Sequence, residues 1–187
     1  MIVIETPRLI LRQFESGDLE DLHHILSDAT TMSFWPAPFT RGETQKWLER
    51  RLDSYRENGP VRLAVILREE NVLIGDCGLA QSEIDGRPEN DLGYIIHHAF
   101  WKHGYGTEAA EACIRYGFDM LQLRRICANM PVDHIASRRI AEKLGMRLEK
   151  QFENKRNRNI LTCLYVREVE PSAGGSAPQK EGRAHDD

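Results

Sequence analysis

The sequence predicts a single α/β domain in which about seven strands form a mostly antiparallel mixed sheet flanked by four helices. Two observations support this fold class. Apolar residues switch between the two-residue period of strands and the 3.6-residue period of helices along most of the chain. The segments follow one another as strand, two helices, three strands, helix, strand, helix and two strands, and 187 residues are ordinarily one domain.

The first third of the chain contains one strand and two helices. Leu9–Phe14 is a short apolar run with strand composition. Ser16 is placed to cap a helix over Asp18–Leu26, whose leucines and isoleucine recur at helical spacing. The run Thr40–Glu43 fits a capping box, so a second helix is expected from there to about Glu57.

The middle of the chain has the pattern of strands. Arg62–Leu67 and Val72–Ala80 flank the polar run Arg68–Asn71, which predicts a hairpin. A polar loop is expected over Ser82–Asn90, and a third strand over Leu92–His97.

The last third alternates helices and strands. The expected elements are a helix over Thr107–Leu121, a strand over Arg125–Asn129, a helix over His134–Leu144 closed by Gly145, and strands over Arg147–Phe152 and Asn159–Arg167. We expect the folded domain to span residues 1–170. Residues 171–187 contain no Leu, Ile, Val or Phe, which predicts a disordered tail because nothing there offsets the entropy of ordering.

Composition argues against several classes of protein. The net charge of −4 gives no support for a nucleic-acid partner, and no apolar run approaches the length of a membrane span. The N-terminus lacks the pattern of a signal peptide, so we expect a cytoplasmic protein without a membrane partner. The four cysteines lie in apolar stretches without metal-ligand spacing, which predicts core thiols and no zinc site: Cys77, Cys113, Cys127 and Cys163.

One segment has the features of an anion site. The strand Leu92–His97 is followed by a loop containing Gly104 and Gly106, and a long helix begins at once. A helix N-terminus offers unpaired N–H groups, and glycines let the backbone approach a phosphate closely. Lys102 and His103 add positive charge, so phosphate or pyrophosphate binding is expected here. A plain strand-to-helix turn with glycines for tightness remains the alternative.

The run Trp101–Ala109 resembles the pyrophosphate loop of the GNAT acetyl-CoA-dependent N-acetyltransferases. The similarity is strongest to the branch that acetylates the N-termini of ribosomal proteins. Three further segments resemble that branch in the same order: Thr6–Arg12, Ile74–Gly78 and His134–Met146. Together they extend over about residues 6–166, so the resemblance implies that one GNAT-like domain accounts for the whole fold.

The resemblance implies where acetyl-CoA binds. The strands Leu92–His97 and Arg125–Asn129 should splay apart, so that pantetheine amides bond to free main-chain groups between them. The pyrophosphate should lie on the loop amides. The cofactor-binding residues so implied are Ile95, Ile96, His97, Trp101, Lys102, His103, Gly104, Tyr105, Gly106, Thr107, His134 and Ser137.

The implied reaction is direct transfer of acetyl from the thioester to an amine, which must first lose its proton. Glu153 and Asp91 are the candidate bases, and an ordinary solvated carboxylate is the alternative for each. By analogy Ser137 protonates the departing thiolate, unless it only bonds the backbone of its helix turn. Relatives carry a tyrosine four residues later, where this chain has Ala141. Two tyrosines are possible replacements, or else core or CoA-covering residues: Tyr94 and Tyr105.

The acceptor is expected to be a protein N-terminal α-amine. Alternatives are a small-molecule amine, such as a polyamine, an amine antibiotic or an amino acid, and a CoA-binding module without transfer activity. Trp35 and Phe39 lie in a segment that lines the acceptor mouth in the resembled branch, or that only packs on the domain edge. The branch also implies a homodimer. No metal is expected, because His97 and His98 should point to opposite faces of a strand.

Overall fold

The structure, a computed structural model, describes residues 1–56 and 61–169. The predicted tail over residues 171–187 lies outside the described residues, as does Glu57, the expected end of the second helix. The boundary of the folded domain near residue 170 therefore stays a prediction.

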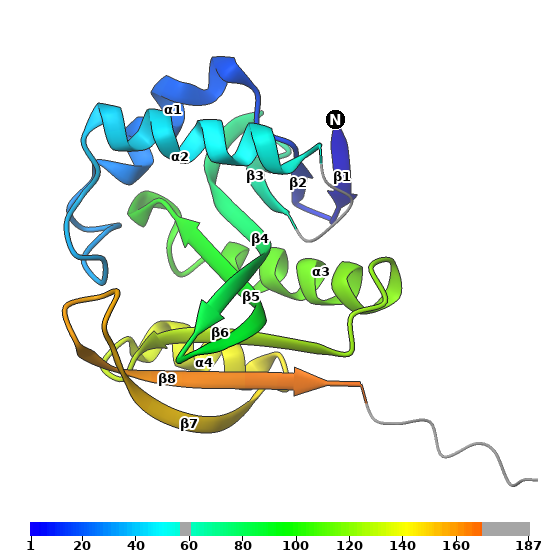
Figure 1. The fold of residues 1–187 in the computed structure, drawn as a ribbon. Coiled ribbons are helices and arrows are strands. Elements are labelled where there is room, and N and C mark those ends of the chain that lie inside the picture. The colour runs from blue at the N-terminus through cyan, green and yellow to red at the C-terminus, as the bar shows by residue number, and fades with distance from the viewer. Residues whose placement is uncertain (57–60, 170–187) are drawn as a thin grey trace, which may run out of the picture.

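The described strands form one eight-stranded sheet in the order β1-β2-β3-β4-β5-β6-β8-β7 (Figure 1). All neighbouring strands are antiparallel except β5 and β6, so the predicted mixed, mostly antiparallel sheet is confirmed. The strands are β1 Ile2–Glu5, β2 Leu9–Arg12, β3 Arg62–Leu67, β4 Val72–Ile84, β5 Arg87–Ile96, β6 Arg125–Pro131, β7 Arg147–Asn154 and β8 Ile160–Glu168.

Two features of the sheet differ from the prediction. The strand β1 was not expected, and it pairs with β2 as an edge strand. The prediction of a polar loop over Ser82–Asn90 is wrong, because β4 and β5 extend through these residues to a tight turn at Asp85 and Gly86. Both turn residues have positive φ, 48° and 78°, as a two-residue hairpin turn requires. The end of this hairpin is largely exposed, which explains its polar, loop-like composition.

All four predicted helices are present. They are α1 Leu19–Leu26, α2 Arg41–Ser54, α3 Tyr105–Asp119 and α4 Ile135–Lys143. The predicted capping box is confirmed, since Thr40 accepts from the N–H of Glu43 while Glu43 accepts from that of Thr40. The cap predicted at Ser16 is wrong, because that residue begins a 3-10 turn, and Asp18 is the residue before α1.

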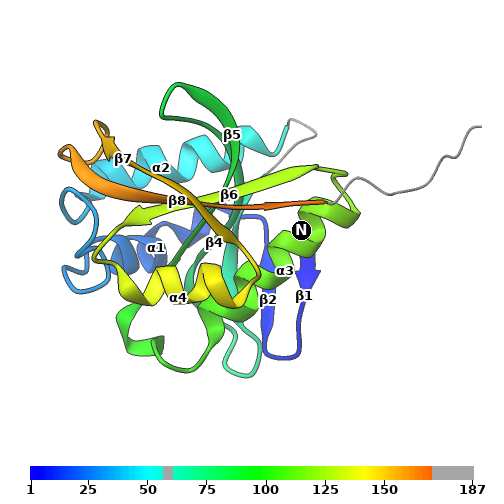
Figure 2. The ribbon, with the colours of Figure 1, turned by 90° about the horizontal axis from the view of Figure 1, so that it is seen from below.

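The sheet separates two large hydrophobic cores, and a third, smaller cluster consists of Ile84, Cys127, Leu164 and Val166. One core packs α3 and α4 against one face, and the other packs α1 and α2 against the opposite face. Figure 2 shows α3 and α4 on one side of the strands and α2 on the other. Ile96 points into the first core and Ile95 into the second, as the alternation of a strand requires. All four cysteines are buried and free, as predicted.

A buried ion pair crosses the α1–α2 face of the sheet. Arg62 Nε donates to Asp76 Oδ1 over 2.6 Å, and Trp47 Nε1 donates to the other oxygen of that carboxylate over 3.0 Å. Asp76 is fully buried, so both bonds are needed to offset its desolvation. The guanidinium lies against Gly93 of β5, where a Cβ would stand 1.7 Å from Arg62 Nη1. Gly93 therefore leaves the space that this arginine occupies.

Gly93→Ala tests this packing. The added methyl group cannot coexist with Arg62 in its present position, so we expect the free energy of unfolding to fall by about 1–3 kcal/mol. Urea denaturation measures the change. Gly42→Ala is the matched control, because a Cβ there meets nothing within 4 Å and a helical alanine should not destabilise. Equal stability of Gly93→Ala and the wild type would contradict the proposed role of Gly93.

Candidate active site

The strands β5 and β6 form a bridge at a single parallel pair, Asp91 with Cys127. Toward their C-terminal ends they separate, as Figure 1 shows, and the predicted splay is confirmed. We call the bridged end of this gap the closed end and the separated part the opening. Side chains join the strands at the closed end, where Asn129 Nδ2 donates to Asp91 Oδ1 over 3.0 Å and Asn90 Nδ2 donates to the Arg125 carbonyl over 3.1 Å.

Arg125 strengthens the closed end. Its guanidinium contacts Glu149 at 2.9 Å, Glu89 at 3.0 Å and Glu168 at 2.8 Å. These carboxylates come from β7, β5 and β8, so one cation links four strands. Hydrogen bonds that Arg125 donates to Glu149 and Glu89 raise its pKa, which fits a charge surrounded by acceptors.

The main chain of β5 has one edge directed into the opening. The N–H of His97 donates to the Ile74 carbonyl of β4 over 2.9 Å. Because successive residues of a strand direct their backbone groups to opposite edges, the N–H of Ile96 and that of Tyr94 face the opening. Of the three residues that the resemblance singled out here, Ile96 therefore offers its main chain there, while Ile95 and His97 direct theirs toward β4.

The loop after β5 leads directly into the N-terminus of α3. Gly104 precedes the helix with φ of 84°, a left-handed conformation that favours glycine. The N–H groups of Tyr105, Gly106 and Thr107 lie in the first turn, where a helix supplies no acceptors. Lys102 is exposed beside them. The expected anion cradle is thus formed by backbone, and its occupant stays a prediction. Two neighbouring loop residues are exposed as well, Trp101 and His103.

Sequence reasoning missed Arg8, which reaches this loop from the turn between β1 and β2. Its Nη1 donates to the His103 carbonyl over 2.9 Å, and its guanidinium lies 4.7 Å from the centre of the Tyr105 ring. Glu108 holds Arg8 in place through a contact of 2.6 Å, and Thr6 Oγ1 donates to the same carboxylate over 2.7 Å. The motif that includes Thr6 and Arg8 was visible in the sequence. The contact of Arg8 with Glu108, 100 residues later, was not.

Ser137 meets Tyr94 across the opening. The two hydroxyl oxygens are 2.6 Å apart, one from the first turn of α4 and one from β5. Burial raises the pKa of Tyr94 to about 12, so its phenol keeps its proton at neutral pH. Tyr105 instead stacks on His103 in the loop. Of the two tyrosines that the sequence left open, Tyr94 is therefore the partner of Ser137.

His134 caps α4. Its Nδ1 accepts from the N–H of Ser137 over 3.4 Å, and its ring stacks on Phe34 with centroids 3.8 Å apart. Burial lowers the pKa of His134, so the ring is neutral at pH 7, as an acceptor at this position requires. A CoA-binding role for His134 stays a prediction.

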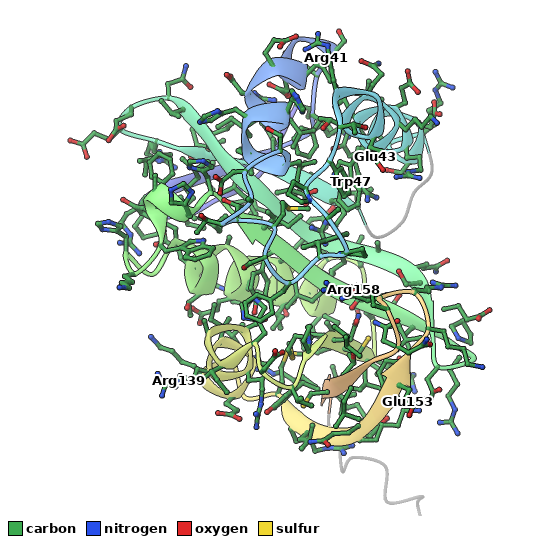
Figure 3. The ribbon with its side chains drawn as sticks, turned by 90° about the vertical axis from the view of Figure 1, so that its left-hand side faces the viewer. Arg41, Glu43, Trp47, Arg139, Glu153 and Arg158 are labelled. Carbon is green, nitrogen blue, oxygen red and sulfur yellow. The ribbon has the colours of Figure 1, made fainter. Side chains whose placement is uncertain are left out.

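The two candidate bases lie in different surroundings. Asp91 is partly buried at the closed end, where desolvation raises its pKa to about 6 despite the opposing effect of Arg62. Glu153 is exposed on the edge strand β7, which two strands separate from β5, and Figure 3 shows it in the other half of the molecule from Trp47. The fold brings Asp91, and not Glu153, to the junction of β5 and β6.

The two residues of the predicted acceptor wall, Trp35 and Phe39, are partly buried, and their contact with an acceptor stays a prediction. Trp35, Phe39 and Trp47 form a cluster of edge-to-face rings with centroids 5.6 to 5.7 Å apart, within the second core. A cavity of about 450 Å³ lies nearby, and its walls include Phe34, Val132, Asp133, Arg158 and Leu161. Three loops form it, those after α1, after β6 and after β7. Their approach is visible at the left of Figure 1.

The expectation that His97 and His98 point apart is wrong. His97 follows Ile96, the last residue of β5, and His98 begins a 3-10 turn, so the alternation of the strand does not extend to this pair. Their ring centroids are 4.6 Å apart. None of the helices in residues 1–56 and 61–169 is long and apolar enough to span a bilayer.

The sequence and fold are similar to those of known acetyltransferases. The profile of the acetyltransferase (GNAT) domain family matches residues 8–147. An uncharacterized N-acetyltransferase of Bacillus subtilis, YnaD, is 32% identical over 151 residues, which cover 80% of this chain and 85% of that protein. The crystal structure of a GNAT-family acetyltransferase from Bacillus anthracis matches with a TM-score of 0.76 and 28% identity, over 90% of this chain and 98% of that one.

A third similar structure is that of RimL, a ribosomal L7/L12 alpha-N-protein acetyltransferase in complex with coenzyme A. It matches with a TM-score of 0.75 and 16% identity, over 91% of this chain and 99% of that chain. At this identity the similarity concerns the fold.

The raised pKa of Asp91 predicts a pH-dependent stability. The folded protein binds this proton more tightly than the unfolded chain, so the wild type should lose stability as pH rises from about 4 to about 6. Asp91→Asn removes this loss. The stability of the variant relative to the wild type should therefore increase by about 2–3 kcal/mol between pH 4 and pH 8, measured by urea denaturation. A difference independent of pH would contradict the assignment.

Proposed function

The chain belongs to the GNAT family of acetyltransferases, and from this premise we propose that it transfers acetyl from acetyl-CoA directly to the N-terminal α-amine of a protein. The observation that supports this most is the opening between β5 and β6, which leads to a helix N-terminus with free N–H groups. A pantetheine arm fits the first feature, and a pyrophosphate fits the second. The proposed cytoplasmic location rests on the sequence, whose four cysteines have the pattern of reduced core thiols, and the proposed homodimer rests on the resemblance.

Acetyl-CoA is bound mainly through main-chain groups in this proposal. The N–H groups of Tyr105 to Thr107 hold the pyrophosphate, and Arg8 and Lys102 add positive charge next to them. The main chain of β5 that faces the opening bonds the pantetheine arm, and the N–H of Ile96 polarises the thioester carbonyl as charge develops on the oxygen. The loop closes over this end because Trp101 Nε1 donates to the Ile96 carbonyl over 2.6 Å.

The cavity beside the opening is the proposed acceptor site. Its volume of about 450 Å³ accommodates the first residues of a peptide, with apolar walls at Phe34 and Leu161 and charged groups at Asp133 and Arg158. Asn157 Nδ2 donates to the Phe34 carbonyl over 3.0 Å, which holds two of the walls together. Several similar folds belong to proteins described as ribosomal-protein acetyltransferases, which agrees with a peptide acceptor.

Two groups are proposed to move the protons of the reaction. Asp91 accepts a proton from the ammonium form of the acceptor through a chain of water, since it lies at the closed end of the gap. A carboxylate with a pKa near 6 is ionised at neutral pH and is a stronger base than an ordinary one. The hydroxyl pair of Ser137 and Tyr94 donates a proton to the departing CoA thiolate. Ser137 is the donor, and the phenol of Tyr94 passes its own proton on to Ser137. The second proton of the amine nitrogen, released as the amide forms, returns to Tyr94, so the pair ends the reaction neutral.

A thiol-release assay tests the proposed activity. The full chain should release CoA from acetyl-CoA with peptides that have a free N-terminus, and not with the same peptides after N-terminal acetylation. Gly104→Glu should abolish acetyl-CoA binding in calorimetry, because its side chain enters the cradle and its φ is left-handed. Gly42→Glu, on the exposed start of α2, is the control that keeps binding.

The outcomes of this assay separate the alternatives. Release with polyamines, amine antibiotics or amino acids, and with no peptide, would replace the peptide acceptor by a small amine. Acetyl-CoA binding without release for any acceptor would indicate a CoA-binding module. Unchanged acetyl-CoA affinity of Gly104→Glu would overturn the proposed phosphate site.

Variants of the hydroxyl pair test the proton donor. Ser137→Ala should lower kcat by about 10²- to 10⁴-fold and leave acetyl-CoA affinity nearly unchanged. Tyr94→Phe should lower kcat less, since Ser137 keeps its own hydroxyl. Tyr116→Phe is the control, because this tyrosine lies in α3 and has no part in the pair. Steady-state kinetics and calorimetry measure both quantities, and wild-type kcat in Ser137→Ala would exclude the role.

A further inference from the structure

A cluster of potential metal ligands lies where α1 ends beside the last residue of β5. It consists of Asp28, His97 and His98, each of which offers one ligand atom, and these three atoms lie within 4.8 Å of one another. His24 adjoins the cluster, since its ring centroid is 5.0 Å from that of His97. Three imidazoles and one carboxylate from two distant segments therefore meet at one corner of the fold.

The backbone holds two of these residues in place. The N–H of His98 donates to Thr31 Oγ1 over 3.0 Å, and the N–H of Thr31 donates to Asp28 Oδ1 over 2.6 Å. The turn after α1 is thereby fixed against the first residue of the 3-10 turn. His98 Nδ1 lies 2.8 Å from Asp28 Oδ1, so the two side chains already face each other.

The protonation states of Asp28 and His97 also suit metal ligation. Hydrogen bonds from Thr31 lower the pKa of Asp28 to about 2, which keeps this carboxylate ionised. Burial lowers the pKa of His97, and the neighbouring His98 and His24 add to this effect. A neutral imidazole is the form of histidine that binds metals.

We propose that Asp28, His97 and His98 form a site for a divalent transition-metal ion of the zinc class. Zinc takes histidine nitrogen and carboxylate oxygen at about 2.0–2.2 Å, which puts neighbouring ligand atoms of a tetrahedral site about 3.4 Å apart. To reach this geometry, ligand atoms up to 4.8 Å apart must approach, and the His98–Asp28 pair must separate slightly from 2.8 Å. The partial exposure of the Asp28 and His98 side chains, 23% and 41%, leaves room for these rotations. His24 or water completes the coordination.

The site has a structural consequence that does not depend on acetyl transfer. A bound ion would link the end of α1, on one face of the sheet, to the segment that leads from β5 into α3. The apparent stability of the folded chain would rise with the concentration of the ion, because the unfolded chain does not hold these ligands together.

Calorimetric titration of the full-length, untagged, chelator-treated chain with zinc chloride tests the proposal. We expect one ion per chain with a dissociation constant in the micromolar range or below, and a higher Tm in the presence of zinc. Asp28→Asn and His98→Ala should each weaken binding at least tenfold. Cobalt(II) provides a second readout, since its visible absorption reports tetrahedral nitrogen and oxygen ligands.

Variants of similar residues outside the cluster serve as controls for zinc binding. His23→Ala and Asp21→Asn change the same residue types on α1 outside the cluster and should bind zinc as the wild type does. His185→Ala tests whether the histidine near the C-terminus is the ligand instead. Absence of saturable zinc binding to the wild type would overturn the proposal. Wild-type affinity in both cluster variants, or loss of binding in His185→Ala, would also overturn it.

Discussion

The site depends on the single bridge between Asp91 and Cys127. A fully paired β5 and β6 would satisfy each other's main-chain groups and leave no gap. With one pair only, the main chain of β5 beyond it keeps free donors that face an opening. Such a gap is stable only if its closed end is held firmly, and the ion pairs of Arg125 with three carboxylates from three strands supply that constraint. Strong contacts between the strands at the closed end thus allow β5 and β6 to remain unpaired at the opening.

The opening also joins the two faces of the sheet, and each face contributes different chemistry. The face under α3 and α4 contains the hydroxyl pair of Tyr94 and Ser137. The opposite face, under α1 and α2, contains the buried charges Arg62 and Asp76. Asp91 lies at the edge of this second region, where burial raises its pKa and Arg62 limits the rise. The proton acceptor and donor proposed for the reaction therefore have separate electrostatic surroundings.

The sequence predicted the parts of this arrangement that depend on local pattern. Helical spacing, the capping box at Thr40 and the glycines of the loop placed the helices, most strands and the anion cradle. Three pairs of side chains join residues 43, 70 and 100 positions apart in the sequence, and no local pattern encodes such separations. These pairs are Tyr94 with Ser137, Asp28 with His98, and Arg8 with Glu108. The hairpin of β4 and β5 was missed because exposed strand residues have the composition of a loop.

The strand order has a consequence for synthesis on the ribosome. β8 follows β7 in the chain but lies between β6 and β7 in the sheet. Until β8 has emerged, β6 has one antiparallel neighbour fewer, and Arg125 lacks its contact with Glu168. The gap proposed to receive the thioester therefore acquires its fixed width only after residue 168 is made. A nascent chain should contain most of the loop proposed to bind phosphate well before it has a usable channel.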